Sequence, residues 1–291
     1  MLLTIVILAV SIASAVSYLR PKPQPRFSLN AAIVDQLAEE IPNPTFVNNA
    51  ETILENHGFK VMYYNETDVN FFGKLAENDY GIIILRAHSA LREPNNSTVD
   101  LFTSEPYDSS AYVEDQQNEL LVEGFLNYSN GVKNYFAITS KFIDSLEGTF
   151  PQSIVIAMGC NTLVLGKEQL AEAFINKGAK AYIGWDGYVG DSDTDSQTIQ
   201  LLTNLLTYNE TLDEAVNGGG GLWDITYGSK MAYYPSAAGD LTISSLAANI
   251  PTTSQLQSTL LTRPLEAKPD PVSKRLKYLR SSLMQIDSSV A

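Results

Sequence analysis

The sequence predicts an α/β fold in which helices cover both faces of a mainly parallel sheet. Two short segments, residues 81–85 and 153–158, are apolar throughout except for Ser153 at the start of the second, and such runs are typical of strands buried on both faces. Segments with helical periodicity alternate with strand-like segments along the chain, as they do around parallel sheets. The 291 residues, 44% of them hydrophobic, are enough to bury one sizeable core. No internal repeat is present, which excludes a solenoid.

The first part of the chain supplies three of these strands and two helices. Strands are expected at residues 31–37, 60–64 and 81–85, and helices at residues 46–57 and 69–77. The first helix carries one apolar stripe, and Gly58 follows it as a stop signal. His57 therefore marks the end of a helix in this interpretation.

Residues 91–139 interrupt the alternation with polar, turn-rich sequence. Short β-like pieces within it predict an inserted β-hairpin or lobe, with strands at 99–103, 120–127 and 134–139. The alternation then resumes with helices at 141–146, 167–177 and 196–206 and strands at 153–158 and 181–184.

One main domain is expected at residues 31–250. The apolar residues 1–19 are a signal peptide or an uncleaved membrane anchor, and residues 20–30 are a Pro-rich linker. Residues 251–291 are polar and are expected to form a tail with one short helix at 273–284.

Two signals disagree about the side of the membrane. Basic residues directly after the apolar residues 1–19 favour a cytoplasmic location for the main domain. Glycosylation-type sequons favour an exported glycoprotein, and they lie at Asn65, Asn95, Asn96, Asn127 and Asn209. The sequence is interpreted as extracytoplasmic, with a membrane anchor slightly favoured over secretion after cleavage.

The charge balance argues against nucleic acid as a partner. The chain has 19 Lys and Arg against 33 Asp and Glu, a formal net charge of -14. Such a surface repels phosphate backbones and offers no basic patch from which counterions could be released.

Two side chains that could take part in catalysis follow the two apolar runs. His88 comes shortly after the first run and Cys160 shortly after the second. The carboxyl ends of parallel strands form the edge where ligands bind, so neighbouring strands would bring the two residues together. An imidazole in reach of a thiol can convert it into a thiolate nucleophile. Cys160 is the only cysteine, so no intrachain disulfide can form.

Plainer interpretations of both residues stand beside this one. A single cysteine after an apolar strand is most often an inert core residue. A single histidine is most often a capping or partly buried polar group. The coincidence of both at strand ends weakens these alternatives without removing them.

A longer stretch carries a resemblance to a known family. Residues 154–162, Ile-Val-Ile-Ala-Met-Gly-Cys-Asn-Thr, and residues 170–185 resemble the catalytic-cysteine region of caspase-like (clan CD) peptidases of the CHAT and gingipain type. The similarity covers about residues 31–217, and it is strong around Cys160 and weaker around His88. It implies the caspase-haemoglobinase fold, in which hydrophobic strands precede a catalytic His and a catalytic Cys.

The resemblance also implies a mechanism. Cys160 would attack the scissile carbonyl of a protein or peptide, and a thioester acyl-enzyme would form. His88 would protonate the leaving amine, and the backbone amides of Ser89 and Cys160 would stabilise the oxyanion. No third catalytic residue is expected. The family usually has Gly after its catalytic His, and Ser89 stands there in this chain.

Relatives that cleave after Arg or Lys place a carboxylate in the primary pocket, and one version has Asp two residues before the Cys. Met158 occupies that position here. Asp35 and Asp186, the latter beside Trp185, are the remaining candidates for a substrate pocket.

Two other motifs receive structural interpretations. Asp191, Asp193 and Asp195 alternate as in a calcium loop, but the required Gly and bidentate Glu are absent. An acidic turn that caps a helix is favoured, no resident metal or cofactor is expected, and an irregular calcium site is left open. The glycines 218–221 lack the Lys-Ser/Thr of a phosphate loop and are interpreted as a mobile loop.

Two rival functions remain. One is a catalytically inactive caspase-like module that mediates surface interactions, since Ser89 is atypical. The other is a flavodoxin-like binding domain, which would need a glycine-rich phosphate loop after the first strand, and residues 36–43 contain no glycine.

Overall fold

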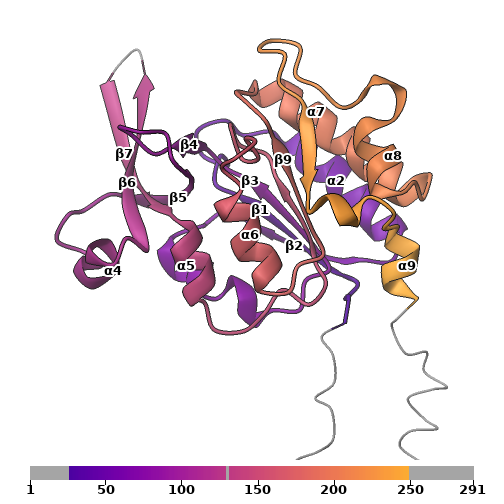
Figure 1. Ribbon diagram of the computed structural model, residues 1–291, viewed down its shortest axis with the longest axis horizontal. Helices are drawn as coiled ribbons and strands as arrows, with labels where there is room; N and C mark the ends of the chain where they lie inside the picture. Colours follow the sequence, from indigo (N-terminus) through magenta and orange to yellow (C-terminus); the bar gives the residue numbers. More distant parts are fainter. Residues whose placement is uncertain (1–25, 129–130, 249–291) are drawn as a thin grey trace, which may run out of the picture. The chain divides into compact units, whose positions relative to one another are not determined.

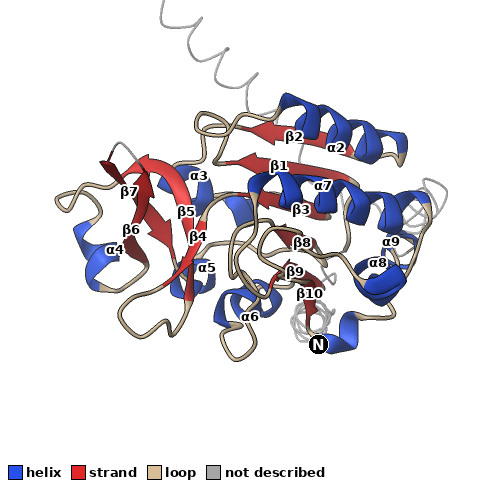
Figure 2. Cartoon of the chain, turned by 90° about the horizontal axis from the view of Figure 1, so that it is seen from above, coloured by secondary structure: helices blue, strands red, loops and turns tan. Residues whose placement is uncertain are grey.

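A computed structural model describes residues 26–128 and 131–248, and the predicted α/β class with a mostly parallel sheet is confirmed (Figures 1 and 2). The main sheet has six strands in the order β10-β9-β8-β3-β1-β2. Neighbouring strands are parallel except for the pair β10 and β9. The strands are β1 (Asn30–Asp35), β2 (Lys60–Tyr64), β3 (Ile82–Arg86), β8 (Ile154–Ala157), β9 (Ala181–Trp185) and β10 (Met231–Tyr234).

Helices cover both faces of this sheet. Alternate strand residues enter two separate apolar clusters, so that Ile82 and Ile84 belong to one and Ile83 and Leu85 to the other. The first cluster is completed by α2 (Pro44–Asn56), α7 (Asp191–Leu202), α8 (Leu212–Asn217) and α9 (Ile243–Ala247). The second is completed by α3 (Val69–Gly73), α5 (Ser140–Ser145) and α6 (Gln169–Asn176). Burial on two faces explains why β3 and β8 are continuous apolar runs.

Helix α2 shows how local sequence sets the ends of an element. The Asn43 side chain accepts a hydrogen bond from the Phe46 N–H, and Pro44 occupies the first helical position. His57 is the C-cap, and Gly58 adopts a φ of 84° directly after it. The interpretation of His57 as a helix terminus is therefore confirmed.

The β-rich insertion forms a second, antiparallel sheet, ordered β4-β5-β7-β6. Its strands are β4 (Ser89–Leu91), β5 (Val99–Pro106), β6 (Leu121–Tyr128) and β7 (Gly131–Ile138). This agrees with the hairpin or lobe expected from residues 91–139. The three-residue strand β4 and the single-turn helix α4 (Val113–Gln117) are too short to produce a periodic signal.

Other elements depart from the expected boundaries. Helix α7 begins at Asp191 and not at residue 196, with Asp191 and Asp193 in its first turn, where the helix dipole favours carboxylates. A π-helical turn, η2 (Thr203–Thr207), extends it. Short 3-10 turns lie at η1 (Leu75–Glu77), η3 (Gly218–Gly220) and η4 (Ser236–Ala238). Helices α8 and α9 and strand β10 were not predicted from the sequence.

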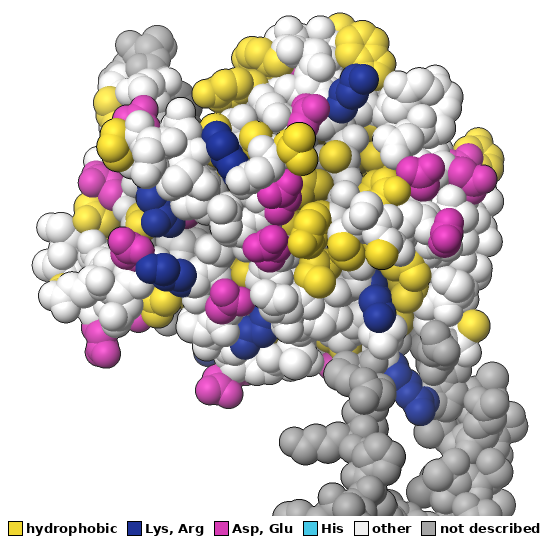
Figure 3. Space-filling model, viewed as in Figure 1, with side chains coloured by type: hydrophobic (Ala, Val, Ile, Leu, Met, Phe, Trp, Pro, Cys, Tyr) yellow, Lys and Arg dark blue, Asp and Glu magenta, His cyan; other side chains and the backbone are white. Residues whose placement is uncertain are grey.

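Several predictions fall on the chain ends. The segment 1–19, most of the linker and the tail 251–291 lie outside the described residues. Within residues 26–128 and 131–248, no helix combines the length and the apolar character that crossing a bilayer requires. On the face shown in Figure 3, Lys and Arg side chains are interspersed with Asp and Glu.

Candidate active site

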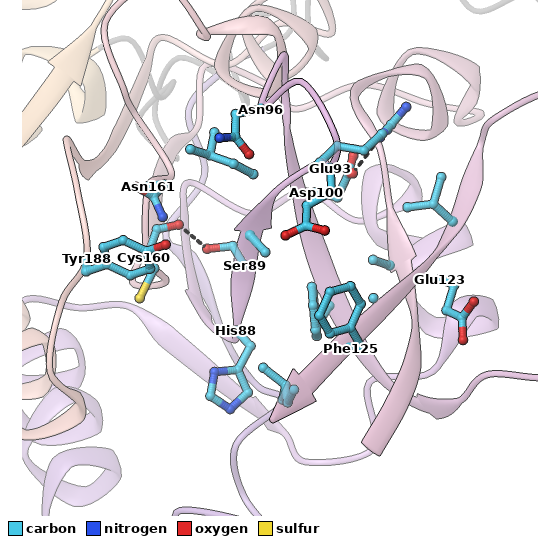
Figure 4. Close-up of a pocket in the computed structure, with 18 residues that line it drawn as sticks. His88, Ser89, Glu93, Asn96, Asp100, Glu123, Phe125, Cys160, Asn161 and Tyr188 are labelled. Carbon is cyan, nitrogen blue, oxygen red and sulfur yellow. Dashed lines mark hydrogen bonds and ion pairs between the residues drawn. The ribbon is translucent and has the colours of Figure 1, made fainter. Parts of the chain in front are cut away.

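The two strands that precede His88 and Cys160 are direct neighbours in the sheet. Strands β3 and β8 pair in parallel, from Ile82 opposite Ile154 to Leu85 opposite Ala157. His88 and Cys160 therefore leave the sheet at the same edge, and both line one cavity of about 410 Å³. Figure 4 shows the imidazole and the sulfur at one side of this cavity, with the inserted sheet opposite them.

The Cys160 thiol is held by the backbone of the loop after β9. The sulfur accepts a hydrogen bond from the Val189 N–H (3.5 Å) and donates one to the Val189 carbonyl (3.6 Å). Burial raises the pKa of the thiol, and the nearby carboxylates of Asp191 and Asp224 raise it further. The resting sulfur is therefore protonated at neutral pH.

The His88 side chain is partly buried, with 21% of it exposed. Its backbone N–H donates to Gln36 Oε1 (2.9 Å), and its ring lies edge-on to Phe102 with centroids 6.4 Å apart. Burial lowers the pKa of the imidazole below its ordinary value of 6.5, against the opposing effect of the Glu40 and Asp191 carboxylates. The ring is consequently neutral at pH 7 and can accept a proton.

Glu40 is a site residue that sequence analysis missed. Its Oε2 lies 3.7 Å from His88 Nε2, which is an ion-pair distance if the ring is protonated but too long for a hydrogen bond. Its Oε1 accepts from Lys133 Nζ (2.7 Å) and from the Tyr135 hydroxyl, both on β7 of the inserted sheet. The available signal was a carboxylate shortly after the carboxyl end of β1, at the edge that carries His88.

Within the described residues, no hydrogen bond joins the His88 imidazole to the Cys160 thiol. His88 Nε2 is buried without a hydrogen-bond partner, and the sulfur is directed to Val189. Catalytic hydrogen bonds are often long or misaligned before substrate binds.

Ser89 and Gly159 interlock the loops after β3 and β8. The Ser89 hydroxyl donates to the Cys160 carbonyl (2.6 Å). A Cβ on Gly159 would lie 2.3 Å from that hydroxyl oxygen and 2.5 Å from the Ala87 carbonyl oxygen, so only glycine fits. The Ser89 side chain therefore occupies space that Gly159 leaves free.

The backbone amide of Ser89 is directed away from its partner strand. The Phe102 N–H donates to the His88 carbonyl, and Ser89 pairs with Leu101 in the antiparallel ladder. Because hydrogen-bonded and non-hydrogen-bonded pairs alternate in such a ladder, the Ser89 N–H does not bond to β5. It remains a candidate oxyanion donor beside His88 and Cys160.

The three residues expected in a substrate pocket lie elsewhere. Asp35 is 1% exposed and pairs with Arg86, which also binds Asp195. Trp185 is fully buried, and its indole N–H donates to Thr194. Asp186 accepts from the Lys230 N–H. None of Asp35, Trp185 and Asp186 lines the cavity that holds His88 and Cys160.

The alternating acidic residues Asp191, Asp193 and Asp195 lie in helix α7. Asp193 accepts from the Ile225 and Thr226 backbones, while Asp195 binds Arg86. Within residues 26–128 and 131–248, no three His, Cys, Asp or Glu side chains converge as metal ligands.

A scan against protein-family models and a search of curated proteins both find no match for this chain.

Proposed function

We propose that this protein is a cysteine endopeptidase of caspase-like fold, with His88 and Cys160 as its catalytic dyad. One observation carries the proposal: adjacent parallel strands deliver an imidazole and the only thiol of the chain into one open cavity. Apolar strands precede both His88 and Cys160, as the resemblance to caspase-like peptidases implies. The proposed substrate is a protein or peptide, and the proposed setting is extracytoplasmic.

The reaction begins when a scissile carbonyl enters the cavity beside Cys160. The thiol proton passes to His88 while the sulfur attacks the carbonyl carbon. The oxyanion that forms is stabilised by the backbone N–H groups of Ser89 and Cys160. His88 then protonates the leaving amine, which leaves a thioester. Water, deprotonated by His88, hydrolyses the thioester and restores the thiol.

The acid-base properties of the site favour a dyad that is neutral at rest. Burial raises the pKa of Cys160 and lowers that of His88, so an ion pair is disfavoured before substrate arrives. Proton transfer then accompanies the attack. We expect the rate to fall as the pH falls through the lowered pKa of His88, because a protonated imidazole cannot accept the thiol proton.

The test is cleavage of a peptide library by the full chain and its variants. Cys160→Ala and His88→Gln should each reduce the rate at least about 100-fold, which is typical for loss of a nucleophile or general base. The matched control is His57→Gln, because His57 is the only other histidine and caps α2. Undiminished cleavage by Cys160→Ala would overturn the assignment.

A second candidate is an inactive module of the same fold that binds partners at its surface. The observation in its favour is the Cys160 thiol, which binds the Val189 backbone and not His88. A thiol-directed peptide inhibitor separates the candidates, since Cys160 is the only possible site of labelling. Saturable labelling that requires His88 supports the peptidase, and slow labelling that is unaffected by His88→Gln supports the inactive module.

A further inference from the structure

The cavity beside the dyad is walled mainly by apolar side chains of the inserted sheet. Leu91 of β4, Phe102 of β5 and Val122, Phe125 and Leu126 of β6 all line it. Figure 4 shows Phe125 across the cavity from Cys160. The volume of about 410 Å³ lies in the range of small-molecule pockets and can hold a large side chain of a substrate.

The wall is continuous with the dyad through Phe102. Its ring lies edge-on to His88, with a centroid distance of 6.4 Å. A Cβ at Gly124 would lie 2.6 Å from this ring, so the glycine allows Phe102 to keep its place against β6. A substrate side chain in the cavity would therefore contact apolar surface close to the reacting groups.

One buried carboxylate also lines the cavity, but its charge is already balanced. Asp100 is 4% exposed, and both of its oxygens accept from Arg92, at 2.7 Å from Nε and 2.5 Å from Nη2. This bidentate pairing with Arg92 satisfies the Asp100 carboxylate and fixes its orientation. A substrate ammonium or guanidinium would have to displace Arg92 to use it.

The remaining carboxylates are poor partners for a buried substrate charge. Glu93 and Glu123 line the cavity but are solvent-exposed, and Glu123 accepts from the Asn134 side chain. Exposed ion pairs contribute little, whereas a charge buried without a direct partner is costly. Acidic substrate side chains are disfavoured as well, because three carboxylates and one guanidinium line the cavity.

We infer that this cavity selects peptides by a large uncharged side chain, aromatic or branched aliphatic, next to the scissile bond, and that the Arg92–Asp100 pair excludes Lys and Arg. The inference rests on the proposed peptidase function. It replaces the preference for basic residues that Asp35 or Asp186 would have supported.

The experiment measures kcat/KM for four peptides that differ only in the residue before the scissile bond, namely Phe, Leu, Lys and Asp. We expect the Phe and Leu peptides to be cleaved at least about tenfold faster than the Lys and Asp peptides, since pocket contacts commonly discriminate by this much. Phe125→Ala should reduce the advantage of the Phe and Leu peptides severalfold. Indifference of the wild-type chain to the four residues, or a preference for Lys or Asp, would overturn the inference.

A second variant tests the charge balance directly. Arg92→Gln leaves the Asp100 carboxylate without its cation, and cleavage of the Lys peptide should rise at least about tenfold. The assay is run at pH 8, because burial raises the pKa of Asp100 and the free carboxylate must be ionised. Arg26→Gln is the matched control, since Arg26 is exposed and does not line the cavity. An unchanged Lys rate in a folded Arg92→Gln variant contradicts the proposed role of the pair.

Binding measurements separate this inference from the peptidase proposal. If the wild-type chain cleaves none of the peptides, the peptidase proposal fails, and selectivity is then measured by calorimetry of the same peptides with Cys160→Ala. Tighter binding of the Phe and Leu peptides supports the inference even then, and equal or absent binding overturns it. If Arg92→Gln does not fold, the inference is tested by the wild-type preference among the four peptides and by the effect of Phe125→Ala on it.

Discussion

Two polar groupings lie side by side at the same edge of the main sheet, and they differ in how fully their groups are satisfied. Arg86 ends β3, is fully buried, and binds Asp35, Asp195 and the Ile41 carbonyl. His88, two residues later, has a buried nitrogen without a hydrogen-bond partner. The Cys160 thiol has only weak sulfur contacts to a backbone.

This difference distinguishes a structural network from a candidate reactive site. Buried polar groups in folded proteins are nearly always paired, as those of Arg86 are. An unpaired polar atom beside an open cavity indicates a group kept available for a ligand or a proton. The contrast makes opposite predictions for stability and for activity at positions only two residues apart.

The largest effect on stability is expected from breaking the Arg86 network. Arg86→Met leaves two buried carboxylates without their cation and should lower the free energy of unfolding by about 3–5 kcal/mol. Urea denaturation, followed by the fluorescence of the buried Trp185, measures the change. Lys141→Gln removes an exposed ion pair with Glu119 and should leave the midpoint unchanged. Equal midpoints for both variants would contradict a structural role for Arg86.

A smaller loss is expected where the two loops interlock. Gly159→Ala places a methyl group against Ser89 and the Ala87 carbonyl and should cost about 1–3 kcal/mol. Adding Ser89→Gly should recover only part of this loss, because the Ala87 carbonyl remains in contact. Gly73→Ala is the control, since no atom lies within 4 Å of its Cβ position. Thermal unfolding measures the stability of the three variants, and Gly159→Ala should be the least stable. Full recovery of stability in the double variant would show that the contact with the Ala87 carbonyl is harmless.

His88 should behave in the opposite way to Arg86. His88→Leu removes an unsatisfied buried nitrogen and should change stability at pH 7.5 by no more than about 0.5 kcal/mol, while cleavage is lost. A loss of several kcal/mol, measured by urea denaturation, would assign His88 to the structural network.

The same variant reveals how pH acts on His88. The folded-state pKa of His88 is lowered, so the unfolded chain binds more protons as the pH falls below 6.5. This contribution to stability is complete above pH 6.5 and is lost towards acid pH. Between pH 7.5 and 5.5, the wild-type chain should therefore lose more stability than His88→Leu. A parallel loss in both chains would refute the lowered pKa.

The smallest effect concerns Glu40. Its negative charge favours protonation of His88, so Glu40→Gln should lower the pKa of His88 further. NMR titration of the His88 ring protons in the wild-type chain and in Glu40→Gln measures this shift. An unchanged His88 titration would show that the two groups are not coupled.

Elements with strong local signals were predictable. Strand β2 lies at the expected residues 60–64, and the ends of α2 follow from Asn43, Pro44 and Gly58. The start of α7 was misplaced because Asp191 and Asp193 resemble a loop in sequence, whereas the helix dipole places them in a first turn. The elements α8, α9 and β10 span only four to six residues, which is too short for periodicity to identify.

The candidate site was only partly predictable for a similar reason. His88 and Cys160 could be selected because each follows a buried apolar strand, a signal within one segment. Glu40, Arg92 and Asp100 could not, because their roles depend on which charged groups of other segments they meet. Asp35 was expected in a substrate pocket, and its pairing with Arg86 could not be foreseen, since Arg86 lies 51 residues away in sequence.

The amino-acid sequence by itself determined the layered α/β class, the two buried strands and the residues that follow them, because periodicity and helix caps act over a few neighbouring residues. Only the tertiary structure decided which charges are neutralised, which side chains share the cavity and which way the thiol is directed. Those outcomes depend on burial and on contacts between distant segments, and both arise when the sheets and helices pack together.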